Sequence, residues 1–106
     1  PARSVTLPVT GGPRPVWANA WARPGRLLGY LLDQAWGFDG REAGRLEGAQ
    51  VVVGESVAAG TVAVEWWDAD TGRIVGRRAW LHPGGRLVLA APAFTRHLAF
   101  KLSRDG

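Results

Sequence analysis

Residues 61–72 read TVAVEWWDADTG, and this stretch decides the predicted fold. Its first seven residues alternate between two sets of side chains, which is the pattern of a strand with one buried face. The set predicted to face a core is Val62, Val64 and Trp66. Glu65 and Trp67 then lie next to each other on the opposite face. The double indole therefore predicts one buried ring and one outward ring.

The polar residues that follow this strand predict a β-hairpin. The Asp68 side chain can cap the turn, and Gly72 supplies the positive φ that closes it. The second strand of the hairpin is predicted at residues 73–81. Its inner set is predicted to be Val75, Ala79 and Leu81. This assignment leaves Trp80 beside Arg78 on the outer face.

Glycine and proline divide the rest of the chain into short segments. Fifteen Gly and seven Pro leave few windows long enough for an ordinary helix. Apolar or alternating runs between them predict strands at 3–9, 16–23, 27–33, 50–53, 61–67, 73–81, 86–90 and 98–102. This pattern is typical of an antiparallel sandwich or barrel, and we expect an all-β antiparallel β-sandwich of about eight short strands. Residues 34–48 are expected to form a loop because of Gly37, Gly40 and Gly44, with a short helical turn as the alternative.

The predicted strand at residues 16–23 carries two further indoles. Trp17 and Trp21 share a face with Asn19 and Arg23, opposite a row of small side chains. Two interpretations stay open: the rings line the core, or they point outward. An outward Trp can contact another domain or stack on sugar rings, whose flat C–H faces match an indole.

Composition and charge limit the classes of partner. The chain has 106 residues, which predicts a single domain over residues 1–106. Thirteen Lys and Arg against nine Asp and Glu give a net charge of +4, but the basic residues are scattered, with only Arg77 and Arg78 adjacent. Because phosphate binding uses clustered cations, we expect no nucleic-acid partner. No apolar run approaches the roughly 20 residues of a membrane-spanning helix, so no membrane partner is expected. The chain has no Cys and hence no disulfide.

The acidic and histidine residues form no recognisable catalytic motif. The carboxylates considered are Asp33, Asp39, Glu42, Glu47, Glu55, Glu65, Asp68, Asp70 and Asp105. Glycoside hydrolysis needs two carboxylates about 5–10 Å apart, and no segment of this chain predicts a cleft between such a pair. The spacing Asp68-x-Asp70-x-Gly72 lacks the Gly and Glu positions of a calcium loop, and His82 and His97 lack further zinc ligands. We therefore expect no catalytic residue, no metal and no cofactor.

The hairpin also carries a family resemblance. Two motifs carry this resemblance. The first lies in the hairpin and reads Val64-Glu65-Trp66-Trp67-Asp68-x-x-Thr71-Gly72. The second follows a Gly-rich break and reads Leu87-x-Leu89-x-x-Pro92-x-Phe94-x-x-x-Leu98-Ala99-Phe100-x-Leu102. These motifs resemble the C-terminal β-sandwich of many TIM-barrel glycoside hydrolases, including the domain described as collagen-binding in related hydrolases. The resemblance covers residues 60–102. Ala69 stands where the family pattern usually has Pro, and His97 where it often has Asp.

The resemblance implies a non-catalytic accessory domain of a glycoside hydrolase. The catalytic barrel, of roughly 250 residues, then lies elsewhere in a longer chain. The start at Pro1 without an initiator Met also leads us to expect a C-terminal fragment. The implied partners are a polysaccharide and the catalytic domain of the same chain, and the resemblance favours an extracellular location. The candidate ligand-binding residues are Trp67, Trp80, Glu65, Arg78, Trp17 and Trp21. The alternatives are a structural module that packs against the barrel and a protein-binding module of the collagen type.

Overall fold

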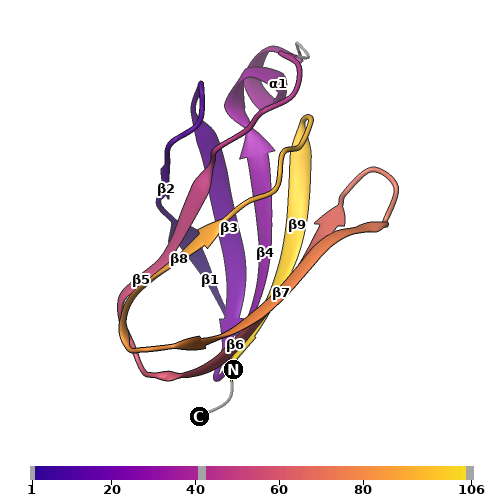
Figure 1. Ribbon diagram of the computed structural model, residues 1–106. Coiled ribbons are helices and arrows are strands. Elements are labelled where there is room, and N and C mark those ends of the chain that lie inside the picture. Colours follow the sequence, from indigo (N-terminus) through magenta and orange to yellow (C-terminus); the bar gives the residue numbers. More distant parts are fainter. Residues whose placement is uncertain (1, 41–42, 105–106) are drawn as a thin grey trace.

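Two antiparallel β-sheets pack face to face around a hydrophobic core (Figure 1). The computed structural model describes residues 2–40 and 43–104, and of Phe38 and Asp39 it describes the backbone alone. The larger sheet has the order β1 (Arg3–Leu7), β3 (Val16–Arg23), β4 (Arg26–Asp33), β9 (His97–Arg104), β6 (Gly60–Asp68) and β7 (Ile74–His82). The smaller sheet has the order β2 (Val9–Thr10), β5 (Gln50–Val57) and β8 (Gly85–Ala90). The predicted all-β sandwich is confirmed.

The strand predicted at residues 3–9 is divided between the two sheets. β1 pairs with β3 in the larger sheet, whereas β2 pairs with β5 in the smaller sheet. Pro8 lies between them and has no N–H to donate to a ladder. Its carbonyl instead accepts a hydrogen bond from the Val52 N–H at 2.8 Å, so the chain crosses from one layer to the other at this proline.

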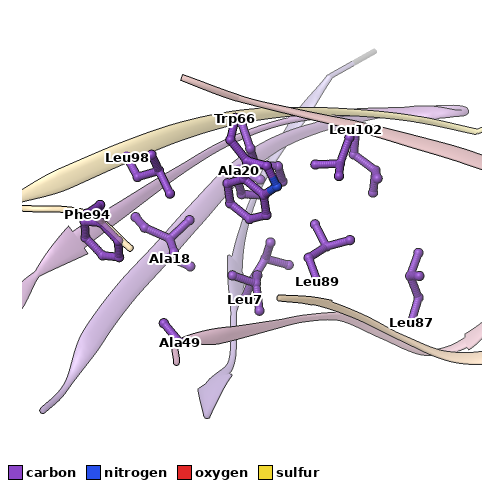
Figure 2. Packing of buried hydrophobic residues seen from close by; sticks show 14 of the residues in the cluster. Leu7, Ala18, Ala20, Ala49, Trp66, Leu87, Leu89, Phe94, Leu98 and Leu102 are labelled. Carbon is purple, nitrogen blue, oxygen red and sulfur yellow. The ribbon is translucent and has the colours of Figure 1, made fainter. Parts of the chain in front are cut away.

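The core lies between the sheets and follows the predicted alternation of β6. Val62, Val64 and Trp66 are at most 5% exposed, which confirms the assignment of their face. Figure 2 shows the Trp66 ring pointing from the larger sheet toward Leu89 of the smaller one. Complete burial of one such aromatic or branched aliphatic side chain contributes about 1.5–3 kcal/mol, so these strands supply much of the stabilising burial.

Phe100 packs directly on the backbone of the neighbouring strand. It lies opposite Gly29 in the β4–β9 ladder and is 0% exposed. A Cβ atom at Gly29 would fall against the ring, 2.8 Å from Phe100 Cδ1 and closer still to two other ring carbons. The ring also contacts Trp66, with 5.2 Å between the ring centroids. The glycine is therefore required by a close approach within the core.

The face assignment predicted for β7 is wrong. β6 and β7 pair so that Trp80 lies opposite Val62 and Arg78 opposite Val64, which places both on the core side of the sheet. The predicted inner set Val75, Ala79 and Leu81 is exposed. Alternation alone does not determine which face of β7 is buried, because both faces carry apolar side chains. The register of the pairing with β6 determines it.

A short helix, α1 (Gln34–Asp39), stands where the glycines predict a loop. The Asp33 side chain accepts a hydrogen bond from the first turn at 3.1 Å, and Gly40, with a φ of 65°, ends the helix by donating to the Trp36 carbonyl at 2.9 Å. An N-cap of this kind contributes about 1 kcal/mol, which offsets the similar cost of Gly37 inside the helix. The alternative of a short helical turn is therefore confirmed, and the loop prediction is wrong for these six residues.

The capping residue Asp33 also holds a buried ion pair. Its carboxylate is 1% exposed and lies 2.7 Å from Arg14 Nη2. Arg14 donates a further hydrogen bond to the Gly44 carbonyl at 2.7 Å. The pair therefore fastens the segment after α1 to the end of β4.

The β6–β7 turn has the predicted chemistry. Asp68 Oδ1 accepts hydrogen bonds from the N–H groups of Asp70 at 2.8 Å and Thr71 at 3.1 Å. Gly72 has a φ of 73° and donates to the Asp68 carbonyl at 2.8 Å. These contacts confirm the capped hairpin.

β1 and β7 form the two edges of the larger sheet. The β6–β7 ladder contains a register shift between Trp66 and Trp67, so β7 is irregular near its start.

Within the described residues, no helix has the length and apolar character needed to cross a membrane.

Candidate functional site

The outer face of the larger sheet carries the candidate site. Cross-strand pairing places two rows of side chains beside each other on this face. The first row, from β3 to β7, is Trp21, Leu28, Lys101, Glu65 and Arg77. The second row is Arg23, Arg26, Ser103, Ala63 and Ala79. Residues far apart in the sequence therefore meet on one surface, because β9 lies between β4 and β6 (Figure 1).

These two rows line an open hollow of about 980 Å³ on the sheet surface. Its floor consists of small side chains, those of Ala63, Ala79 and Ser103, flanked by the longer side chains of Trp21 and Lys101. Ligand pockets commonly have volumes of about 300–1,000 Å³ and combine an apolar lining with a few polar groups. The hollow has the size and composition of a binding site.

The exposed indoles lie on this outer face. Trp21 is 57% exposed and Trp17 is 40% exposed, whereas Ala18 and Ala20 on the other side of β3 are buried in the core. Of the two interpretations of β3, the structure therefore selects outward rings. Leu28, opposite Trp21, is 52% exposed, so the wall of the hollow combines an indole with an aliphatic side chain.

Trp67 and Glu65 share the outer face, as predicted, but this indole is restrained. Its Nε1 donates to Glu65 Oε1 at 2.9 Å, and Lys101 Nζ lies 5.0 Å from the ring centroid. Glu65 Oε2 accepts from Arg77 Nε at 3.0 Å. Trp67 is half-buried beneath these contacts, so Trp21 presents more accessible ring surface.

Trp80 does not line this hollow, and Arg78 borders it with its side chain on the other side of the sheet. They lie on the core side of β7, where Trp80 packs against the edge of the core. The Arg78 guanidinium lies 4.8 Å from the Trp80 ring centroid in a cation–π contact. The structure thus places Trp17, Trp21, Glu65 and Trp67 on one face, of which Trp21 and Glu65 line the hollow, and places the side chains of Trp80 and Arg78 on the opposite side of the sheet.

The sequence alone does not identify several residues of this face as members of the candidate site. Leu28 and Tyr30 belong to a strand that is apolar on both sides, so alternation does not identify the outward set. Lys101 alternates with Phe100 and Leu102, which indicates an outward side chain. Its position beside Glu65, however, follows only from the strand order.

A second cluster lies at the end of the sheet near α1. Tyr30 Oη lies 2.5 Å from His97 Nδ1, and His97 Nε2 lies 2.7 Å from Asp70 Oδ1. The Trp36 ring covers the imidazole, with 5.2 Å between the centroids. The cluster connects β4, β9 and the β6–β7 turn, and the adjoining hollow has a volume of about 230 Å³.

The pKa values of Tyr30 and Asp70 indicate which protonation states this cluster adopts. Burial, with a smaller contribution from the Asp70 charge, raises the pKa of Tyr30 above its ordinary value of 10.0. The hydrogen bond from His97, helped by the positive charges of His97 and Arg96, lowers the pKa of Asp70 below 3.8 despite some desolvation. The phenol therefore stays protonated and the carboxylate charged. This arrangement fixes the hairpin turn against the sheet and does not activate the Tyr30 hydroxyl as a nucleophile.

The described carboxylates all have partners. Asp33 and Glu65 are bound by guanidinium groups, as are Glu47 by Arg45 at 3.3 Å and Glu55 by Arg86 at 3.4 Å. Asp68 caps its turn and Asp70 contacts His97. Glu42, Asp105 and the side chain of Asp39 lie outside the described part of the chain, as does Pro1.

His82 has a local role at the end of β7. It is 4% exposed, and its Nε2 lies 3.2 Å from the Gly85 carbonyl across the turn to β8. Across residues 2–40 and 43–104, no group of three or more His, Cys, Asp or Glu residues has the arrangement of a metal site.

Comparison of the chain with protein-family models gives no match, and comparison with curated proteins gives none either.

Proposed function

We propose that this chain is a non-catalytic accessory domain of a glycoside hydrolase and that it binds carbohydrate on the outer face of the larger sheet. The family resemblance in residues 60–102 suggests the enzyme class. The observation that carries the binding proposal is Trp21, 57% exposed at the wall of a hollow of about 980 Å³.

The face has the chemistry that sugars require. A pyranose ring presents a flat apolar face to an indole and hydroxyl groups at its edges. Trp21 and Leu28 supply apolar contact, and Ser103 and the neighbouring cations supply hydrogen-bonding groups. The small floor residues leave room for a ring to approach the sheet.

The dimensions suit an extended polymer. Neighbouring strands are about 4.8 Å apart, so Trp21 on β3 and Trp67 on β6 are separated by roughly 14 Å across the sheet. Trp17 and Trp21 are four residues apart on one strand face, which corresponds to about 13–14 Å. Both spans accommodate several sugar units.

The test is a titration of the chain with soluble xylan, mannan, β-glucan and polygalacturonate, followed by Trp fluorescence and isothermal titration calorimetry. We expect Trp21→Ala to weaken binding by about tenfold or more, since a central aromatic anchor contributes about 2 kcal/mol or more. Trp80→Phe is the matched control, because this indole lies on the other side of the sheet.

Absence of binding to every polysaccharide would contradict the proposal, as would equal affinity of the wild type and Trp21→Ala. Collagen binding through Trp21, without carbohydrate binding, would replace it with a protein-binding function.

A further inference from the structure

We propose that the polysaccharide bound on this face is acidic, with carboxylate groups on its sugar units. This inference rests on the proposed function and names the class of ligand. Five cationic residues are among the described lining of the hollow. Arg23, Arg26, Arg77 and Lys101 lie on the outer face, whereas the Arg78 side chain lies on the core side of β7 beside Trp80. The basic residues that are scattered in the sequence thus form a cluster in space.

The one carboxylate among the described lining residues does not neutralise this cluster. Glu65 has both oxygens engaged, Oε1 by Trp67 and Oε2 by Arg77. Within the described residues, Arg23, Arg26 and Lys101 form no ion pair with a carboxylate. Three exposed positive charges therefore remain around an apolar hollow.

Repulsion between two of these charges lowers the stability of the sheet. Arg23 and Arg26 are direct cross-strand partners at the end of the β3–β4 hairpin, whose turn is formed by Pro24 and Gly25 with a glycine φ of 72°. Like charges in this position repel each other. An anion between them would convert the repulsion into attraction, and a guanidinium can hold a carboxylate through two parallel hydrogen bonds.

The cations are spread in the direction that a polymer would follow. Arg23, Arg26, Lys101 and Arg77 lie on β3, β4, β9 and β7. At about 4.8 Å per strand they span roughly 19 Å across the sheet. A chain that crosses the strands can place successive carboxylates near successive cations while its sugar rings contact Trp21 and Leu28.

The same observations disfavour two other occupants. A second copy of this face would bring two positively charged clusters together. A single-stranded nucleic acid is normally held by several aromatic side chains on which successive bases stack, whereas Trp21 is the single indole that lines the hollow.

The closing experiment separates charge from sugar backbone. Polygalacturonate and its fully methyl-esterified form share one backbone and differ in charge. We expect the wild type to bind polygalacturonate at least about tenfold more tightly, with an affinity that falls as NaCl increases. Alginate serves as a second acidic probe, and neutral mannan and an oligo(dT) of similar length complete the set.

Arg23→Gln/Arg26→Gln should weaken binding of polygalacturonate by about tenfold and binding of the esterified form by a clearly smaller factor, because Gln keeps hydrogen-bonding groups but loses the positive charge. The matched control is Arg45→Gln/Arg86→Gln, which removes the same charge from two residues outside the hollow. This control should retain the wild-type affinity.

Equal affinity for the acidic and esterified polymers would overturn the inference and leave carbohydrate binding standing. Absence of binding to all polysaccharides would overturn both proposals. An equal loss in the control variant, or tighter binding of oligo(dT) than of either acidic polymer, would also overturn the inference.

Discussion

Gly29→Ala tests the packing that connects β4 to β9. The added methyl group would lie inside the contact distance of three Phe100 ring atoms, and the ring is held in place by Trp66. Overpacking of this kind costs about 1–3 kcal/mol, and the complete burial of Phe100 places the cost near 3 kcal/mol. Alanine recovers about 0.5–1 kcal/mol relative to glycine through the unfolded chain. The net expected loss is about 2 kcal/mol, which lowers Tm by roughly 8–16 °C.

The assay is urea and thermal unfolding followed by circular dichroism, with Gly76→Ala as the matched control. Gly76 also lies in a strand of this sheet, but the nearest atom to its added Cβ is Trp66 Cδ1 at an ordinary 3.7 Å. This control should be neutral or slightly stabilising. In a Phe100→Leu background the cost of Gly29→Ala should fall by at least about 1 kcal/mol, because the colliding ring is gone. A neutral Gly29→Ala variant, or strict additivity with Phe100→Leu, would refute the reasoning.

Three further perturbations test the core, the buried ion pair and the acidic turn. Trp66→Ala should lower the free energy of unfolding by about 3–5 kcal/mol in urea titrations; a loss below 1 kcal/mol would contradict its core position. Asp33→Ala removes a helix cap and leaves Arg14 without its carboxylate, so we expect the free energy of unfolding to fall by about 3–5 kcal/mol in urea titrations. Asp33→Asn retains the capping oxygen and should lose less. The lowered pKa of Asp70 contributes stability above pH 3.8 that is lost as the pH falls through its folded-state pKa. When the free energy of unfolding is measured against pH, it should therefore decline less steeply toward acid pH in Asp70→Asn than in the wild type. Identical pH profiles would exclude this contribution.

Alternation predicts a strand's orientation when one face is clearly apolar. In β6 the contrast between Val62 and Glu65 is sufficient, and the hairpin turn follows from Asp68 and Gly72. In β7 the outward Leu81 and the inward Trp80 are both apolar, so the orientation depends on pairing with a neighbour. Local chemistry also decides α1, where the capping carboxylate of Asp33 offsets the cost of Gly37 and Gly40 ends the helix.

The candidate site could be predicted only within single strands. The sequence shows that Trp17 and Trp21 share a face and that Glu65 and Trp67 do the same. It does not show that Lys101 lies beside Glu65, because that contact depends on β9 inserting between β4 and β6. The cluster of cations has the same origin, since β3, β4, β9 and β7 each contribute one charge to a surface that no local sequence pattern predicts.

The exposed border of the larger sheet at β7 has a consequence for association between molecules. An unpaired strand border can recruit a strand from another chain and start aggregation. β7 carries Arg77 and Arg78 at its centre and an interrupted register near its start. An incoming strand would meet two adjacent arginines and an irregular stretch of backbone near the start of β7. These features protect the border against growth into a continuous intermolecular sheet.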